Sequence, residues 1–209
     1  MSVSPHHPGA AAPHQPDNHN LYAGPPPWDI GRPQPTFQAL ADAGAVHGRV
    51  LDVGCGTGEH ALMAARLGLD ATGIDLAPRA LELAAKKAEE RGLTARFLRH
   101  DARLLADLGE TFDVLLASLV LHGFRGQDRE AFVKSLHAAV RPGGRCFLLC
   151  FRDEPLPTSG STHRVAPQEV RTAFADGWRI DTIDAATIDS ALPVRPEGIR
   201  GWRAALTRI

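Results

Sequence analysis

Apolar residues along the chain form short continuous runs, and the stretches between these runs repeat their apolar positions with a helical period. Continuous apolar runs are typical of strands buried on both faces, and helices between such strands indicate a mostly parallel sheet. The pattern predicts strands at residues 49–53, 71–74, 95–98, 112–119 and 145–151, and helices at residues 37–45, 59–67, 78–91, 128–140 and 167–175. An α/β fold is therefore expected.

The two ends of the chain depart from this alternation. Residues 178–188 and 201–209 are both strand-like, with no helix between them. Residues 1–27 are rich in proline, alanine, histidine and polar residues, and such a segment cannot bury enough apolar surface to fold alone. We expect a disordered tail over residues 1–27 and one domain over residues 28–209. The tail histidines lack the spacing of a metal site.

Three glycines at alternate positions, Gly54, Gly56 and Gly58, follow the first expected strand and precede a helix. Glycine at such a turn lets a ligand lie directly against the main chain near a helix N-terminus. The dinucleotide fingerprint G-x-G-x-x-G places its third glycine one residue later. No lysine or arginine lies in this loop, and Glu59 opens the helix, where it would repel a pyrophosphate but not a cationic ligand.

Two aspartates accompany the glycine loop. Asp52 lies within the first strand, and Asp75 ends the second strand about 20 residues after the loop, where the acid of a βαβ unit accepts hydrogen bonds from a ribose diol. With Asp52 before the loop and Glu59 after it, the site is acidic at both ends, which suits a ligand that carries an amino group and a sulfonium. The pattern therefore predicts a nucleotide-type cofactor site.

Composition is that of an ordinary globular enzyme, with 209 residues, 44% of them hydrophobic, and a net charge of −1. The basic excess of nucleic-acid-binding proteins is missing. A local basic cluster alternates with glutamates, as on a solvated helix face, and consists of Lys86, Lys87, Arg91, Arg96 and Arg99. No apolar run approaches the roughly 20 residues that span a bilayer, and no signal-peptide core is visible. Cys146 and Cys150 lie too far apart on one strand, about 13 Å, for a disulfide, so we expect a reducing cytoplasm.

Residues 51–58 closely resemble the first motif of the class I S-adenosylmethionine-dependent methyltransferases. Three further features match in order, namely Asp75, Asp101 after the third strand, and residues 141–144 before the fifth. The resemblance implies a Rossmann-like, mostly parallel sheet of seven strands, with helices on both faces and a C-terminal antiparallel hairpin. It also implies S-adenosyl-L-methionine as the cofactor.

The resemblance assigns roles at the first two strands. Gly54, Gly56 and Gly58 would let the methionine and ribose portions lie against the backbone. Asp52 would serve the amino group, directly or through water, or alternatively cap the helix that follows. Asp75 would hold the ribose hydroxyls.

Further cofactor contacts are implied along the chain. Leu76 would pack on the adenine, although an ordinary core position is an open alternative. Asp101 would accept a hydrogen bond from the adenine amino group, with the backbone of Ala102 beside it, or else cap a helix at residues 102–108. Ser118 and Leu119 end the fourth strand, at the sheet edge where such folds bind ligands, and their backbone would meet the methionine part.

His122 is the candidate catalytic residue. Methyl transfer from a sulfonium is an in-line displacement that depends mainly on alignment, and orientation alone can supply roughly 7–11 kcal/mol of barrier lowering. A base is then needed only to remove a proton from an N–H, O–H or S–H nucleophile. His122 follows the fourth strand, and histidine in general is suited to proton transfer near neutral pH. It would act as the general base or contact the substrate, and the alternative is that it only packs near the cofactor.

Residues 27–35, together with residues 56–60, resemble a bacterial branch related to thiopurine S-methyltransferases and small-molecule heterocycle N-methyltransferases. That branch methylates small aromatic or heteroaromatic compounds. Trp28 and Arg32 would then contact the substrate from a proline-stiffened lid, although Trp28 could instead be a hydrophobic staple. Ala117 stands where the branch often has an acidic residue, so that part of the pocket is expected to differ.

The loop at residues 152–165 follows the fifth strand at the same edge of the sheet. Arg152, His163 and Arg164 could meet an anionic substrate there, or could simply be solvated. No histidine-carboxylate cluster indicates a catalytic metal, and no Gly-x-Ser-x-Gly elbow indicates a hydrolase.

These observations predict a cytoplasmic methyltransferase, a monomer or weak homodimer, that methylates an N, O or S atom of a small heteroaromatic or phenolic molecule, in natural-product biosynthesis or detoxification. No metal, nucleic acid or membrane is expected to take part. Two alternatives stay open, an NAD-binding oxidoreductase and an S-adenosylmethionine-binding module without catalysis.

Overall fold

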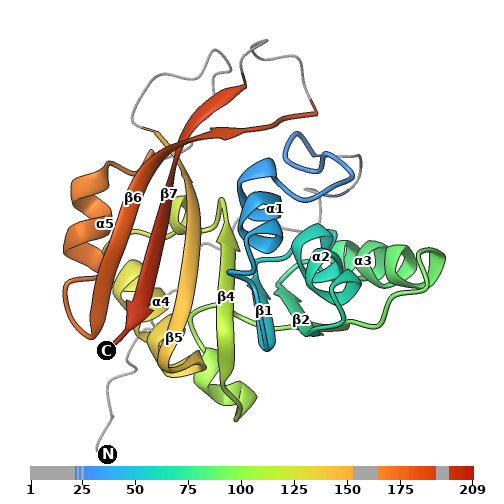
Figure 1. Cartoon of the computed structure of the whole chain (residues 1–209), viewed down its shortest axis with the longest axis horizontal. Helices are drawn as coiled ribbons and strands as arrows, with labels where there is room; N and C mark the ends of the chain where they lie inside the picture. The colour runs from blue at the N-terminus through green and yellow to red at the C-terminus, as the bar shows by residue number, and fades with distance from the viewer. Residues whose placement is uncertain (1–21, 23, 25, 153–163, 192–197) are drawn as a thin grey trace, which may run out of the picture.

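The fold is a single seven-stranded sheet in the order β3-β2-β1-β4-β5-β7-β6 (Figure 1). It is taken from a computed structural model, which describes residues 22, 24, 26–152, 164–191 and 198–209. The strands are β1 Arg49–Val53, β2 Asp70–Asp75, β3 Arg96–Arg99, β4 Phe112–Ser118, β5 Val140–Phe151, β6 Trp178–Ile188 and β7 Ile199–Arg208. The expected α/β class is confirmed.

Strands β1 to β5 pair in parallel, whereas β7 lies antiparallel between β5 and β6. Only ten residues separate β6 from β7, fewer than the dozen or so that a crossover between parallel strands needs, so the two strands pair antiparallel. The predicted sheet, mostly parallel with a C-terminal antiparallel hairpin, is therefore confirmed.

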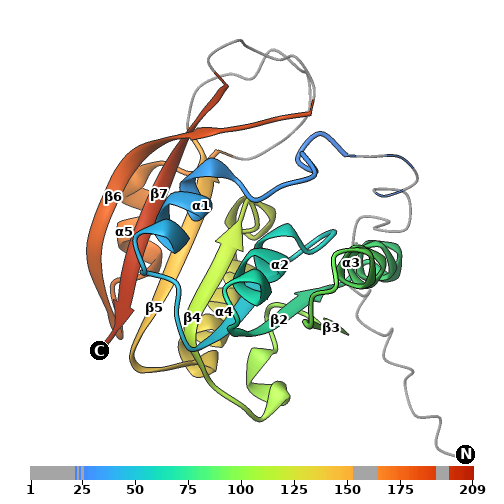
Figure 2. The ribbon, with the colours of Figure 1, turned by 45° about the vertical axis from the view of Figure 1, so that its right-hand side comes forward.

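Helices cover both faces of the sheet (Figure 2). The helices are α1 Pro35–Asp42, α2 Glu59–Arg66, α3 Pro78–Glu90, α4 Gly126–Ala139 and α5 Pro167–Ala173. Successive strand residues alternate between two apolar cores. Val114 packs in the core under α1 and α2, and Leu115 packs in the core under α4 and α5. This two-sided burial is why the strands show continuous apolar runs.

Two boundaries differ from the expected ones. Strand β5 begins at Val140, not Arg145, because the backbone pairs with β4 on both sides of a register shift opposite Phe112 and Val114. The helix considered at residues 102–108 is a short 3₁₀ turn, Leu105–Leu108. The sequence pattern missed the first residues of β5 because Pro142 and Gly143 are more typical of turns than of strands.

The topology brings the carboxyl ends of β1, β2 and β4 to one edge of the sheet, beside the amino end of α2 (Figure 1). The strand order reverses at β1, because the chain continues from β1 to β2 on one side and later returns to β4 on the other side. Such a switch point is where open α/β sheets bind ligands. Within the described residues, no helix is long and apolar enough to cross a membrane.

Candidate active site

The glycine loop between β1 and α2 is built with backbone angles that favour glycine. Gly54, Gly56 and Gly58 have φ of 66°, 53° and 84°. A Cβ on Gly54 would lie 2.7 Å from Val120 Cγ2, and one on Gly58 would lie 2.8 Å from Phe97 Cε1. Side chains are therefore excluded at both positions by the positive φ and by close neighbours.

Asp75, the last residue of β2, connects the loop to the start of α3. Its Oδ2 accepts a hydrogen bond from Gly56 N at 2.9 Å, and its Oδ1 accepts one from Ala77 N at 2.9 Å. Burial raises the pKa of Asp75, and the two backbone hydrogen bonds only partly oppose this effect. An ionised carboxylate has about four lone-pair sites, so each oxygen keeps one for a further donor.

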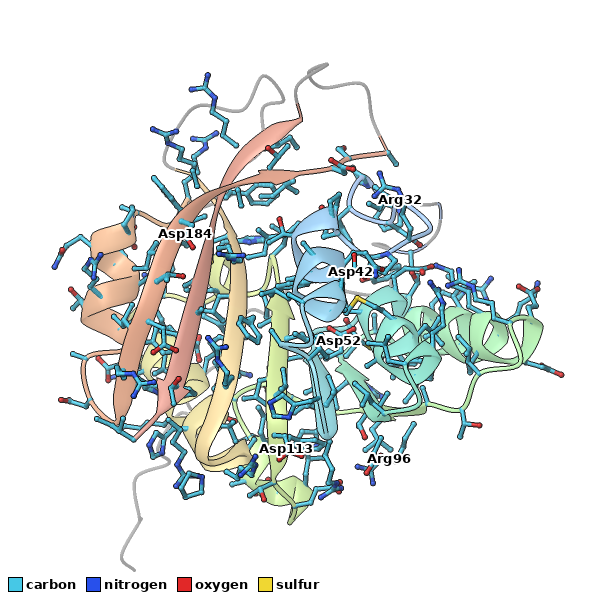
Figure 3. The ribbon with its side chains drawn as sticks, in the orientation of Figure 1. Arg32, Asp42, Asp52, Arg96, Asp113 and Asp184 are labelled. Atoms are coloured by element: carbon cyan, nitrogen blue, oxygen red, sulfur yellow. The ribbon has the colours of Figure 1, made fainter. Side chains whose placement is uncertain are left out.

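Asp52 lies fully buried near the end of β1, next to α2 (Figure 3). Its Oδ2 accepts a hydrogen bond from Ala61 N at 3.1 Å, which means that the residue does cap the helix. Among the described residues, no hydrogen-bond donor reaches its Oδ1. His60 Nδ1 lies 3.8 Å from that oxygen. The cap therefore uses one carboxylate oxygen, and contact between the other oxygen and the cofactor stays a prediction.

The structure corrects the interpretation of Glu59. Its two oxygens accept hydrogen bonds from Lys87 and from both terminal nitrogens of Arg91, at 2.7–2.9 Å. Burial alone would raise the pKa of Glu59, but these bonds outweigh it and the pKa lies below its usual range. Glu59 is thus a neutralised structural group that does not repel anions. The prediction that Lys87 and Arg91 belong to a solvated face is also wrong.

Lys87 also reaches the glycine loop. Its Nζ donates to Thr57 Oγ1 at 2.7 Å, and Thr57 donates to Asp29 Oδ2 at 2.8 Å. A lysine thus lies beside the loop in space although none lies in it in sequence. Through Asp29, this network attaches the segment before α1 to the loop.

The residues predicted to contact the adenine differ in burial and in their hydrogen bonds. Leu76 is half-buried and Ala102 is buried. The carboxylate of Asp101 is engaged by Arg103, whose backbone N lies 2.9 Å from Oδ1 and whose guanidinium donates to both oxygens. This guanidinium lowers the pKa of Asp101. Asp101 therefore closes a turn onto Arg103 and caps no helix, and its contact with adenine stays a prediction.

The end of β4 carries a strained residue. Leu119 has φ of 59°, and within the described part of the chain every other residue with positive φ is a glycine. Its backbone N donates to Leu149 O at 2.8 Å, which fixes it on the sheet. Unfavourable backbone angles of this kind cluster at functional sites. Ser118 and Leu119 are both half-buried, on the edge predicted for the cofactor.

His122 lies in a 3₁₀ turn, Leu121–Gly123, directly after β4. Its ring is half-buried and lies 5.2 Å, centroid to centroid, from the ring of Phe151 at the end of β5. Arg152 follows Phe151 in the chain, and its guanidinium lies 5.0 Å from the ring centre of Trp202. The histidine therefore lies on the same edge of the sheet as Asp52 and Asp75.

Trp28 is 43% exposed, with its ring edge-on to Tyr22 at 6.4 Å between centroids. Arg32, which is labelled in Figure 3, forms an ion pair with Asp189, just after β6. Arg164 is half-buried, and His163 lies outside the described residues. The substrate contacts expected of these side chains stay predictions.

Sequence reasoning missed several residues that meet at this site. Tyr22 is buried on Ala77 and Ala80, and its hydroxyl lies 2.9 Å from where a Cβ on Gly56 would be. Burial and the charge of Asp75 raise its pKa. A lone tyrosine before the three prolines was the available signal. The other missed residues are Asp29, Gln34, Thr57, His60 and Lys87.

An α/β sheet with a glycine loop at its switch point and acids ending its first two strands defines an enzyme class that binds nucleoside-containing cofactors. A family model described as a methyltransferase domain matches residues 50–144. The 2-heptyl-1-hydroxyquinolin-4(1H)-one methyltransferase of Mycobacteroides abscessus is 36% identical over 165 residues, which cover 78% of this chain and 73% of that protein. The demethylmenaquinone methyltransferase of Thermus thermophilus is 39% identical over 125 residues, covering 58% of this chain and 56% of its own.

Among solved structures, one described as "Conversion of a Disulfide Bond into a Thioacetal Group during Echinomycin Biosynthesis" has a TM-score of 0.78 and 37% sequence identity. It covers 88% of this chain and 85% of its own. The chain belongs to the class I S-adenosylmethionine-dependent methyltransferases. It is therefore a methyltransferase that uses S-adenosyl-L-methionine, and neither the oxidoreductase nor the binding-only alternative is supported.

The residues at the edge of the sheet fit this cofactor. Asp52 Oδ1 is a buried carboxylate oxygen with no donor among the described residues, as a bound amino group requires. Both oxygens of Asp75 retain acceptor capacity for two hydroxyls. The described residues hold no group of three histidine, cysteine or acidic side chains that could bind a metal ion.

Proposed function

We propose that this methyltransferase transfers a methyl group to an N, O or S atom of a small heteroaromatic or phenolic molecule. The observation that carries the proposal is the pairing of His122 with Phe151, a base beside an aromatic ring, on the edge that holds Asp52 and Asp75. Aromatic rings bind flat molecules through offset or edge contacts. The half-exposed Trp28 and the M. abscessus relative, named for a hydroxyquinolone, support the same acceptor class.

The cofactor supplies an electrophilic methyl group on a sulfonium, which becomes a neutral thioether on transfer. The protein's own contribution is alignment and the removal of one proton. Asp52 and Asp75 orient the donor, and Trp28 covers the acceptor and excludes water. His122 takes the proton from the attacking N–H, O–H or S–H group.

The test is a product screen with isotopically labelled S-adenosylmethionine, run against libraries of heterocycles, phenols and thiols and against host extract. A labelled product of a flat heteroaromatic or phenolic compound is expected, identified by its mass shift. Labelling of a nucleic acid, a protein or only aliphatic compounds would contradict the proposed acceptor class.

The proposed setting is the cytoplasm, with the protein as a monomer or weak homodimer. Cys55, Cys146 and Cys150 are all buried and unbridged, which accords with a reducing compartment. The net charge of −1 gives no support to a nucleic-acid partner. Light scattering over a range of protein concentrations tests the oligomeric state.

A further inference from the structure

His60, the second residue of α2, links the cofactor site to the segment before α1, here called the N-terminal strap (residues 26–34). Gln34 N donates to His60 Nε2 at 3.2 Å. Because Nε2 accepts this bond, the proton of the neutral ring lies on Nδ1. That Nδ1 lies 3.8 Å from Asp52 Oδ1, and the ring packs edge-on against Phe37 at 4.8 Å between centroids.

The strap is attached at its other side to the end of β6. The side chain of Gln34 is only 2% exposed, and it donates to Asp189 O at 3.0 Å and accepts from Asp189 N at 2.9 Å. Ala191 N also donates to Pro27 O at 2.8 Å. A continuous path of contacts therefore runs from Asp52 through His60 and Gln34 to the strap and the sheet hairpin.

We propose that His60 is a positioning residue that couples the Asp52 carboxylate to the N-terminal strap, so that cofactor binding orders the strap that carries Trp28. The hydrogen bond from Ala61 N fixes one oxygen of the Asp52 carboxylate, and His60 Nδ1 lies 3.8 Å from the other oxygen. The same ring holds the backbone of Gln34. By linkage, whatever fixes Asp52 stabilises the strap, and a fixed strap strengthens cofactor binding equally. The inference rests on the assignment of Asp52 to the cofactor amino group.

The test compares His60→Leu, which removes both polar ring atoms, with His60→Gln, which keeps one donor and one acceptor. Binding of S-adenosylhomocysteine is measured by calorimetry, and amide hydrogen exchange of the strap is measured with and without that ligand. We expect the ligand to slow exchange of the strap in the native protein. We expect His60→Leu to weaken binding about tenfold and abolish the slowing, and His60→Gln to restore most of both.

A second pair of variants avoids any change in α2. Gln34 has φ of −57°, which proline also adopts, so Gln34→Pro removes the backbone N–H that His60 accepts, whereas Gln34→Ala keeps it. Both variants lose the side-chain contacts with Asp189, and only Gln34→Pro also breaks the contact between the backbone of residue 34 and His60. We expect the ligand to slow hydrogen exchange of the strap less in Gln34→Pro than in Gln34→Ala.

The variant Asp52→Asn distinguishes an error in the proposed coupling through His60 from an error in the assignment of Asp52 to the cofactor. Unchanged affinity in Asp52→Asn would remove Asp52 from the cofactor site. Weakened binding in Asp52→Asn, with native affinity and native slowing of exchange in His60→Leu, would overturn the coupling and leave the cofactor site standing. Identical behaviour of Gln34→Pro and Gln34→Ala would overturn it as well.

Discussion

At the scale of single residues, the site combines groups whose roles follow from what they already contact. Asp52 and Asp75 each use backbone N–H groups to fix the carboxylate, and each keeps acceptor capacity. The sequence placed both residues beside the glycine loop, and their contacts with the cofactor stay predictions. The occupied carboxylate of Asp101 was not predictable, because Arg103 satisfies it through a turn that the sequence did not reveal.

Asp75 should make cofactor binding depend on pH. Asp75→Ala should weaken binding of S-adenosylhomocysteine by about 1–3 kcal/mol, since it removes an acceptor of hydroxyl groups. Because burial raises the pKa of Asp75 and the ionised form accepts hydrogen bonds best, native affinity should fall with decreasing pH earlier than an exposed aspartate would cause. Calorimetry across acidic pH measures both effects. Asp75→Asn should lack this pH dependence, and its persistence would contradict the assignment.

His122 should affect the chemical step and leave cofactor binding intact. We expect His122→Ala to lower kcat by about 10²–10⁴-fold on the true acceptor, the usual contribution of a positioned base. Affinity for S-adenosylhomocysteine should stay within about twofold. Steady-state kinetics and calorimetry measure the two quantities. A normal turnover rate in His122→Ala would contradict the role of this histidine as the base.

At the scale of elements, α3 supports α2 and the glycine loop through charge. Lys87 and Arg91 on α3 neutralise Glu59 on α2, and Lys87 also holds Thr57. The sequence shows only a mixed-charge helix, in which the glutamates of the same helix look like sufficient partners. Packing of α3 beside α2 selects a different partner, because a buried carboxylate without a cation would be costly.

Glu59→Gln should therefore destabilise the fold by about 1–3 kcal/mol, as for the loss of a charged hydrogen-bonding group that is buried. The control is Glu82→Gln, whose carboxylate pairs with Arg79 at a site where both side chains are more than half exposed, and it should change stability by no more than about 0.5 kcal/mol. Urea denaturation measures both. Equal effects of the two variants would contradict the structural role of Glu59.

The stability difference between the native protein and Glu59→Gln should depend on pH. The pKa of Glu59 lies below its usual range in the folded protein, so its contribution to stability is present above the ordinary pKa of a glutamate. The contribution is lost as the pH falls through the lowered pKa. The difference between native protein and Glu59→Gln should therefore shrink in acid.

At the scale of the whole molecule, the N-terminal segment is part of the folded domain over more of its length than composition indicated. Tyr22 packs on the start of α3, and Pro27 O accepts a hydrogen bond from Ala191 N beyond β6. Both Tyr22 and Pro27 fall within residues 1–27, the region predicted to be a tail. Composition could not reveal this packing, because one aromatic residue hardly changes the average hydrophobicity of a proline-rich segment.

Truncation separates the tail from the domain. Removal of residues 1–20 should leave the unfolding temperature within about 1 °C of the native value, because this part was predicted to be disordered. Removal of residues 1–25 also takes Tyr22, whose burial is worth about 2 kcal/mol, and should lower the temperature by about 4–8 °C. Calorimetric melting measures both proteins. The same melting temperature for the two truncations would show that Tyr22 contributes nothing to stability.

The sequence by itself determined the local and periodic features of this protein. Apolar runs and glycine spacing defined the strand-helix alternation, the loop Gly54 to Gly58 and the acids Asp52 and Asp75, because each depends on neighbours close in the chain. Tertiary structure alone decided which distant groups meet. Arg32 and Asp189 are 157 positions apart, and Lys87 lies 30 positions from Thr57. Such pairs form only when helices pack on a completed sheet, and no local pattern in a single sequence encodes that packing.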